Sequence, residues 1–166
     1  MRGRSLSALA LLAAGFPGSG AHAQPQLPVI DRIVVHKAAR TMELYVGPRL
    51  VHVFRGIQLG DPNGAKRFQG DRRTPEGHYR IDYGNGDSAY HLSLHISYPA
   101  AEDIARARAA GRSPGGAIFI HGQPGDRPTP GRLEGDWTDG CIALADDEIE
   151  ALWRATPDGT PIDIAP

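Results

Sequence analysis

The sequence predicts a mainly β domain built of antiparallel strands with two short helices, and two observations support this prediction. Short runs in which apolar and polar residues alternate recur along the chain, and glycine or proline separates most of them. Two segments, near residues 99–110 and 146–156, instead have the length and spacing of helices. We therefore expect a sheet that covers a core with one of its faces.

The first part of this domain contains three predicted strands in succession. They cover residues 33–36, 42–46 and 51–54. The Gly-Pro pair at 47–48 supplies a turn between the second and the third. Alternation in the second run places Met42, Leu44 and Val46 on one face. These strands should form an antiparallel meander whose apolar face packs on the core.

A polar segment, residues 61–73, follows the meander and is rich in residues that break regular structure. We expect this loop to be mobile or to face a substrate. It ends at Thr74-Pro75-Glu76-Gly77, which suits a type I turn. Further strands are predicted at residues 78–83, 91–98, 117–122 and 160–164. A loop containing Gly84, Gly86 and Asp87 should separate the first two of these.

The two predicted helices have recognisable ends. Pro99 opens the first, which runs to Ala110 and stops at Gly111. The second covers residues 146–156, and Asp146 or Asp147 can cap it. Its apolar stripe, which we interpret as core packing, consists of Ile149, Leu152, Trp153 and Thr156.

The first 23 residues have the three-part pattern of a cleavable export signal. Arg2 and Arg4 precede an apolar run over residues 6–16, and the segment closes on Ala21-His22-Ala23. That run is too short to cross ~30 Å of hydrocarbon, and no later run is long enough. We therefore expect residues 24–166 to form one domain in the periplasm, with an uncleaved N-terminal anchor as the alternative.

The charge of the expected mature chain argues against nucleic acid as a ligand. Two of the 18 basic residues lie in the export signal, which leaves 16 against 19 acidic residues. A mildly acidic surface without a run of basic residues does not attract a polyanion.

The single cysteine, Cys141, is the candidate nucleophile. Structural cysteines of exported proteins normally form pairs, so an unpaired thiol there needs either burial or a chemical role. Gly140 precedes it and leaves backbone free to approach a substrate. A thiol is mostly protonated at neutral pH and needs a base. His121 ends an apolar strand, and Gly122 lets the chain bend away from it, although a rim histidine without a role is the alternative.

These residues carry a resemblance to a known family. Ile120-His121-Gly122, followed by the run Asp136-Trp137-Thr138-Asp139-Gly140-Cys141-Ile142-Ala143-Leu144, resembles the active-site signature of the L,D-transpeptidase catalytic domain family (YkuD type). The turn at 74–77 and the strand around 157–162 are similar to other parts of that family's pattern. Residues 90–99 resemble its YafK-like murein branch. The resemblance covers about residues 31–164.

The resemblance implies a β-sandwich-like domain that needs no cofactor. Cys141 would attack the carbonyl of a diaminopimelate (or Lys) residue linked to D-Ala in a peptidoglycan stem peptide. The acyl-enzyme would then react with an amine on a second stem or on a lipoprotein. His121 would act as the base, Gly122 would orient it, and the N–H groups of Gly140 and Cys141 would bind the oxyanion. A carbapenem is an expected covalent inhibitor.

The sequence departs from the family pattern at two places. Thr138-Asp139 stands where many members have Ser followed by His or a small residue, and Ala143 stands where many have arginine. The cations that could replace this arginine are Arg72, Arg73, Arg127 and Arg132. The same departures resemble the YafK-like branch, for which release of wall-attached lipoprotein by hydrolysis is known.

The sequence also allows other interpretations of the site residues. His91 and His95 share one face of a predicted strand, either as a solvated face or as contacts to stem-peptide carboxylates. With His121 and Cys141 they could also bind a metal, although no H-E-x-x-H motif is present. Trp137 either walls the substrate groove or anchors the loop, and Thr138 and Asp139 are further substrate-binding candidates. A peptidoglycan-binding module without turnover is the remaining alternative.

Overall fold

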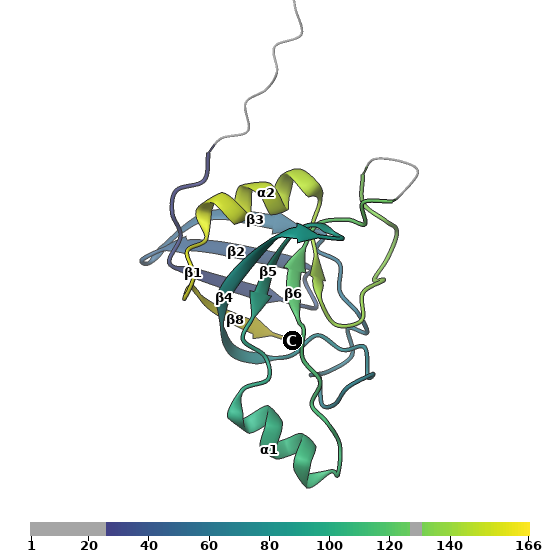
Figure 1. The fold of residues 1–166 in the computed structure, drawn as a ribbon. Helices are drawn as coiled ribbons and strands as arrows, with labels where there is room; N and C mark the ends of the chain where they lie inside the picture. The colour runs from purple at the N-terminus through teal and green to yellow at the C-terminus, as the bar shows by residue number, and fades with distance from the viewer. Residues whose placement is uncertain (1–25, 127–130) are drawn as a thin grey trace, which may run out of the picture.

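The computed structural model describes residues 26–126 and 131–166 (Figure 1). The expected export signal, residues 1–23, lies outside the described residues. In the described part of the chain, no helix combines the length and the apolar character that a membrane span requires. The described residues form two helices and eight strands.

The elements follow one another as the sequence predicts, with one additional strand. They are β1 (Arg32–His36), β2 (Thr41–Val46), β3 (Arg49–Arg55), β4 (Gly77–Ser88), β5 (His91–Ile96), α1 (Ala101–Ala109), β6 (Phe119–His121), β7 (Ile142–Ala143), α2 (Asp146–Ala155) and β8 (Pro161–Ala165). The sequence did not indicate β7, because two residues are too few for an alternation to be visible.

The sheet has the strand order β3-β2-β1-β8-β4-β5-β6-β7. The mainly β fold with two short helices is confirmed, but the sheet is mixed. Strand β8 pairs with β1 in parallel, and so does β7 with β6. Both parallel pairs join segments that are far apart in the chain, whereas the antiparallel meander β1-β2-β3 uses tight turns.

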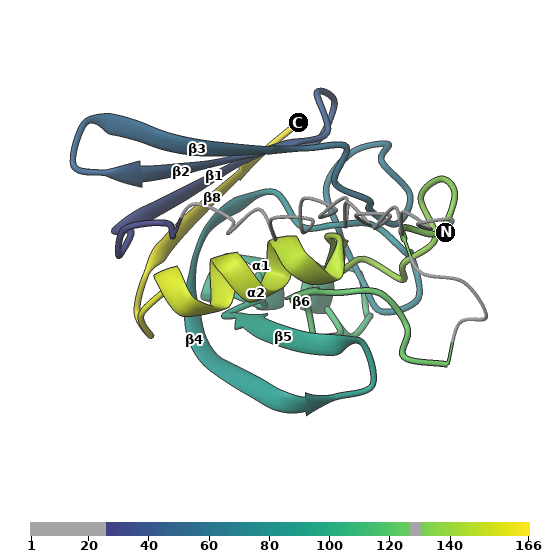
Figure 2. The same cartoon turned by 90° about the horizontal axis from the view of Figure 1, so that it is seen from above.

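Strand β4 connects the two halves of the sheet. Residues 77–80 pair with β8, and the residues from Ile81 onward pair with β5. Figure 2 shows β4 curving from one half to the other, with α2 lying between them. The predicted loop at 84–87 is wrong, because pairing with β5 extends β4 to Ser88 through an irregular register. Gly84 allows this course, since an added Cβ would lie 2.5 Å from the Trp153 ring.

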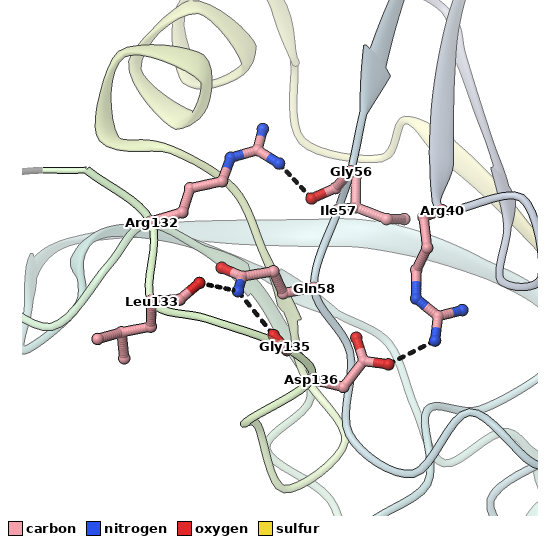
Figure 3. A pocket seen from close by; sticks show the side chains of 8 residues that line it. All are labelled: Arg40, Gly56, Ile57, Gln58, Arg132, Leu133, Gly135 and Asp136. Carbon is pink, nitrogen blue, oxygen red and sulfur yellow. Dashed lines mark hydrogen bonds and ion pairs between the residues drawn. The ribbon is translucent and has the colours of Figure 1, made fainter.

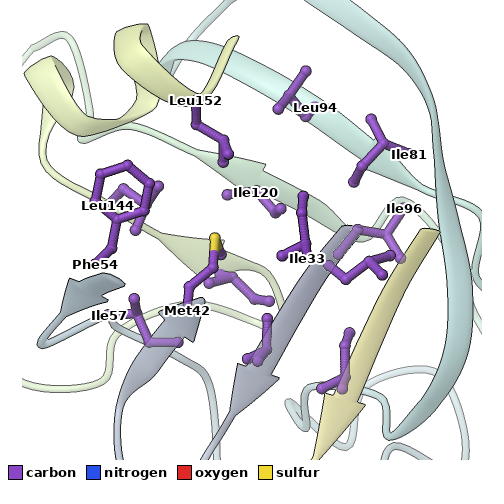
Figure 4. Close-up of a cluster of buried hydrophobic side chains, with 14 of the residues drawn as sticks. Ile33, Met42, Phe54, Ile57, Ile81, Leu94, Ile96, Ile120, Leu144 and Leu152 are labelled. Carbon is purple, nitrogen blue, oxygen red and sulfur yellow. The ribbon is translucent and has the colours of Figure 1, made fainter. Parts of the chain in front are cut away.

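The core lies between the two halves of the sheet. Figure 4 shows apolar side chains of both halves and of α2 pointing toward one another. Met42 and Leu44 are fully buried, as their alternation predicts. On α2, Ile149 and Leu152 are also fully buried, which confirms that its apolar stripe packs on the core.

Helix α2 begins differently from the prediction. Its N-cap residue is Ala145, whose N–H donates to Glu148 Oε2 at 3.0 Å. The predicted cap by Asp146 or Asp147 is wrong, because both residues already lie in the first helical turn. Asp146 Oδ1 instead accepts a hydrogen bond from the N–H of Gln123 at 2.8 Å. This bond ties the chain just beyond β6 to the start of α2.

A buried lysine joins β1 to the polar loop. Lys37 is 1% exposed. Its Nζ donates to Glu76 Oε1 at 2.7 Å, to the Gly64 carbonyl at 2.7 Å and to the Thr74 carbonyl at 3.2 Å. All three ammonium hydrogens therefore have acceptors, which compensates for the loss of water around the charge. Through Gly64 the loop at 61–73 is joined to the end of β1, and its mobility or contact with a substrate stays a prediction.

The Lys37 contacts predict a large loss of stability when the ammonium is removed. We expect Lys37→Met to lower the free energy of unfolding by about 3 kcal/mol, because Glu76 and two carbonyls lose a buried partner. Urea denaturation measures this change. Arg49→Met, at an exposed position in β3, is the control and should stay within about 0.5 kcal/mol of wild type. A loss below about 1 kcal/mol for Lys37→Met would contradict the assignment.

Candidate active site

The pairing of β6 with β7 brings the two main candidates together. In this pair, Ile120 lies opposite Ile142 and His121 lies opposite Ala143. Cys141 directly precedes β7, the strand that pairs with the one that carries His121. These residues are far apart in the chain, and the short parallel pair places them on adjacent strands. Sequence reasoning named both residues but could not provide this contact between strands.

The Cys141 sulfur lies against the backbone at the start of β6. Its Sγ accepts a hydrogen bond from the N–H of Phe119 at 3.4 Å and lies 3.6 Å from the Ala117 carbonyl oxygen, to which the thiol donates. Ala117 has a φ of +53°, a conformation that residues other than glycine seldom adopt. This strained backbone brings the donor and the acceptor to the same sulfur.

Cys141 and His121 line a common cavity of about 290 Å³. Its walls come from the end of β4, from β5, from the start of β6 and from the nucleophile. The lining residues are Asn85, Asp87, Ser88, Ala89, Tyr90, Ser93, Ala117, Phe119, His121 and Cys141. The cavity places a partly exposed thiol beside a buried imidazole in a space large enough for part of a small peptide.

The His121 ring is held in one orientation, and its neutral form in one tautomer. Its Nδ1 lies 2.7 Å from the Gly122 carbonyl oxygen. A carbonyl only accepts, so Nδ1 carries the proton and Nε2 is the basic nitrogen. The ring also packs on Tyr90 and Trp137, with centroids 4.6 Å and 5.6 Å away. Trp137 therefore contacts the imidazole, and its role as a wall of the groove or as an anchor of the loop stays a prediction.

Burial keeps both reacting groups uncharged. It lowers the pKa of His121 below its ordinary value, and the bond to Gly122 opposes this effect. Burial also raises the pKa of the Cys141 thiol, while the N–H of Phe119 acts in the other direction. The charges of Asp139 and Lys66 have smaller, opposite effects on this pKa. Both shifts favour the uncharged forms, a thiol and a neutral imidazole.

Thr138 is part of the turn that holds the nucleophile. It is buried, and its Oγ1 donates to the Cys141 carbonyl at 2.7 Å and accepts from the N–H of Gly140 at 3.2 Å. Its own N–H donates to the Leu59 carbonyl at 3.1 Å. These bonds hold the turn together, and a contact of Thr138 with a substrate stays a prediction. They also occupy the N–H of Gly140.

Two glycines let three segments of backbone meet beside the nucleophile. An added Cβ on Gly60 would lie 1.9 Å from the Arg72 carbonyl oxygen and 2.8 Å from the nitrogen of Gly140. Gly140 has a φ of +121°, and its Cβ would lie 2.6 Å from the Arg73 carbonyl oxygen. Gly140 therefore faces the end of the polar loop rather than a substrate, which corrects the reason given for it from the sequence.

The segment that leads into the nucleophile turn is braced from its other side. A cavity of about 340 Å³ lies beside this segment, and at its wall Gln58 donates to the carbonyls of Leu133 and Gly135, at 2.5 Å and 2.7 Å (Figure 3). Arg40 forms an ion pair with Asp136 at the same place. The side-chain amide of Gln58 and the Arg40–Asp136 ion pair are engaged in these contacts. We therefore interpret the polar groups around this cavity as structural contacts that hold the segment in place rather than as a ligand site.

The histidines of β5 do not line the 290 Å³ cavity. His91 Nε2 lies 2.9 Å from Glu150 Oε1, and His95 Nδ1 lies 2.6 Å from Asp82 Oδ1. Ser93, midway between them, is buried and does line the cavity. Alternation placed it on the same face, and that signal could have identified it. Within residues 26–126 and 131–166, no group of three His, Cys, Asp or Glu side chains could hold a metal ion.

Asp139 belongs to a second cavity, of about 470 Å³, on the side of the polar loop. Its carboxylate forms an ion pair with Arg72, with Nε and Oδ1 2.9 Å apart. Of the other arginines considered from the sequence, Arg73 pairs with Asp61 and Arg132 with Glu148. Arg127 lies outside the described residues. Among these three arginines, Arg72 is the one whose side chain forms an ion pair with a residue of the nucleophile turn.

Comparison with known proteins gives one family. Residues 30–164 match the family model of the L,D-transpeptidase catalytic domain (YkuD). The chain is 32% identical over 96 residues to YafK of Escherichia coli (strain K12), which is named as a proposed L,D-transpeptidase. That alignment covers 54% of this chain and 37% of YafK, so the chain spans well under half of that relative.

Solved structures show the same fold. The helical cell shape determining protein Pgp2 from Campylobacter jejuni is 26% identical, with a TM-score of 0.64 over 84% of this chain and 50% of Pgp2. The Enterococcus faecium L,D-transpeptidase C442S mutant, 15% identical, has a TM-score of 0.55 over 83% of this chain and 50% of its own. This second likeness shows the fold alone.

The contact at Gly60 predicts that a single methyl group disrupts the site. We expect Gly60→Ala to lower the free energy of unfolding by about 2 kcal/mol or more, because its Cβ overlaps backbone that cannot rotate away. Gly86→Ala is the control, since an added Cβ there meets nothing within 4 Å. Urea denaturation compares the two variants. Equal stability of both would show that the segments are not packed as described.

The raised pKa of the Cys141 thiol predicts an unusual pH profile for its alkylation. Because only the thiolate reacts and burial raises the pKa of Cys141, the rate with iodoacetamide should keep rising beyond pH 9. The rate is followed by intact-protein mass spectrometry across a pH series, with free cysteine as the reference. A plateau reached below pH 7 would indicate a thiolate–imidazolium pair and contradict this prediction.

Proposed function

Because the chain belongs to the L,D-transpeptidase catalytic domain family, we propose that it is a peptidoglycan L,D-transpeptidase with Cys141 as its nucleophile. The observation that carries this proposal is the shared cavity of Cys141 and His121, with Nδ1 of the imidazole bonded to the Gly122 carbonyl. This bond leaves Nε2 to take a proton from a thiol that is neutral at rest. The family acts on peptidoglycan, and we extend that substrate to this chain.

The first half of the reaction acylates the enzyme. His121 Nε2 removes the thiol proton while Sγ attacks the carbonyl carbon of diaminopimelate (or Lys) next to D-Ala. The N–H of Cys141 stabilises the oxyanion, because the N–H of Gly140 already bonds to Thr138. The C–N bond then breaks, the imidazolium returns its proton to the departing amine, and D-Ala leaves. A thioester on Cys141 remains.

The second half depends on which nucleophile reaches the thioester. An amine of another stem peptide gives a cross-link, with His121 removing its proton, and the thiol is regenerated. Water would give hydrolysis by the same route, and a bond to a wall-attached lipoprotein would be cut in this way. YafK shares sequence with this chain, and the hydrolytic alternative rests on that resemblance.

We place this activity in the periplasm, where peptidoglycan lies and where the export signal would deliver the chain. Pgp2 is named for determining helical cell shape. If this chain remodels the cell wall, it would also influence the shape of the cell. The alternative from a different class is a peptidoglycan-binding module without turnover.

Mass spectrometry of reaction products tests the proposal. We expect wild-type protein to convert tetrapeptide muropeptides into cross-linked dimers, and Cys141→Ala to form neither products nor acyl-enzyme. His121→Ala should lower the rate by roughly 10²- to 10⁴-fold, because it removes the base and leaves the fold intact. A carbapenem should add its mass to wild-type protein and not to Cys141→Ala.

Each other outcome identifies an alternative. Cysteine-dependent release of peptide from sacculi that carry attached lipoprotein, without new cross-links, would identify a hydrolase. Peptidoglycan binding that survives in Cys141→Ala, with no turnover by wild type, would identify a binding module. Full turnover by Cys141→Ala would disprove the mechanism.

A further inference from the structure

Arg72 and Asp139 form an open ion pair next to the nucleophile turn. Their side chains are 58% and 88% exposed, and the pair lies at the 470 Å³ cavity. An ion pair with this exposure contributes little to stability, because water solvates both charges nearly as well. The pair can therefore exchange its partners for those of a ligand at low cost.

The geometry of the pair leaves donors and acceptors for a ligand. Arg72 uses Nε for Asp139 Oδ1, 2.9 Å away, so the two terminal nitrogens of the guanidinium are not part of this contact. A guanidinium binds a carboxylate through two parallel hydrogen bonds. Asp139 can accept hydrogen bonds from an ammonium group. A guanidinium and a carboxylate side by side thus match a ligand that carries a carboxylate and an ammonium group on the same carbon.

The backbone holds Arg72 in this position. Its φ is +59°, and its carbonyl oxygen accepts the N–H of Asp61 at 2.8 Å and lies against Gly60. A strained conformation of this kind persists only where its surroundings fix it. Lys66, buried and paired with Asp71 at 2.9 Å, forms part of the same cavity wall. The cavity is therefore a fixed structure rather than a chance surface contact.

The position that carries arginine in many relatives cannot bind a substrate here. Ala143 is completely buried, and its N–H and carbonyl bond to Gln58 at 2.8 Å and 2.9 Å. Arg72 approaches the nucleophile turn from the other side, through Asp139. Gly115 and Gly116 line this cavity, whereas the next residue along the chain, Ala117, lines the cavity of Cys141 and has its carbonyl oxygen 3.6 Å from Sγ. The two cavities are therefore lined by consecutive residues, 116 and 117, and Asp139 lies two residues before Cys141 in the chain.

We propose that the Arg72–Asp139 pair binds an α-amino acid head group, with its carboxylate on Arg72 and its ammonium on Asp139. This inference rests on the proposed function and deepens it. Two sources carry this head group: the side-chain end of diaminopimelate in the acyl-donor stem, and a free D-amino acid that acts as acyl acceptor. A lysine side chain offers the ammonium alone, and amidated diaminopimelate lacks the carboxylate charge.

Acylation rates with three stem peptides test the donor source. Intact-protein mass spectrometry follows thioester formation on wild type, Arg72→Gln and Asp139→Asn, with tetrapeptides containing diaminopimelate, amidated diaminopimelate or Lys. We expect Arg72→Gln to slow the diaminopimelate peptide about tenfold and to leave the other two unchanged. Asp139→Asn also alters the charge beside Cys141, so the ratio between peptides is its readout. Arg67→Gln, in the same loop but outside the cavity, is the control and should match wild type.

Release of the thioester by free D-methionine tests the acceptor source. If the pair binds the acceptor, all three stems acylate Arg72→Gln normally, and the amine-dependent release slows about tenfold. Equal losses on every stem, with normal release, would show that the pair only packs the loop and would overturn the inference. No change in either step would overturn it as well.

A binding measurement separates this inference from the proposed function. If wild type forms no thioester with any stem peptide, the proposed function fails. Calorimetry with Cys141→Ala then compares its affinity for the diaminopimelate and Lys peptides, with and without Arg72→Gln. A diaminopimelate preference that Arg72→Gln abolishes would still support the head-group site, and equal affinities for both peptides would overturn it.

Discussion

The close approach of three backbone segments around Gly60 and Gly140 is the constraint on which the site depends. The end of the polar loop, at Arg72 and Arg73, lies directly against the nucleophile turn because neither glycine has a side chain. The polar loop is itself fixed to β1 through Lys37. The turn that carries Cys141 is therefore positioned by the sheet, and the loop forms a wall of the site.

Burial has a second consequence for the nucleophile. A thiolate is the form of cysteine that both attacks carbonyls and reacts with oxidants. Because burial raises the pKa of Cys141, the resting thiol stays protonated and reacts slowly with an oxidising environment. The neutral His121 nearby supplies a base when a substrate is in place. The same desolvation thus protects the sulfur and sets the order of proton transfer in the proposed reaction.

The departures from the family pattern have separate structural explanations. Thr138 stabilises the turn through its hydroxyl, which bonds to both Gly140 and Cys141. Asp139 points away from the turn and pairs with Arg72. Ala143 is buried within a strand pair, where an arginine would lose its water without gaining a partner. In this chain the cation that contacts the nucleophile turn is Arg72, which comes from the polar loop.

The sequence by itself determined the mainly β class, the core stripe of α2, and the choice of Cys141 and His121, because alternation, helical spacing and residue chemistry are local signals. It missed the parallel pairs and the two-residue β7, which depend on partners distant in the chain. It also misjudged the 84–87 segment as a loop, and it left the choice among four arginines open. Only the tertiary structure decided these points, because burial, ion pairing and the approach of separate backbones are properties of the packed chain.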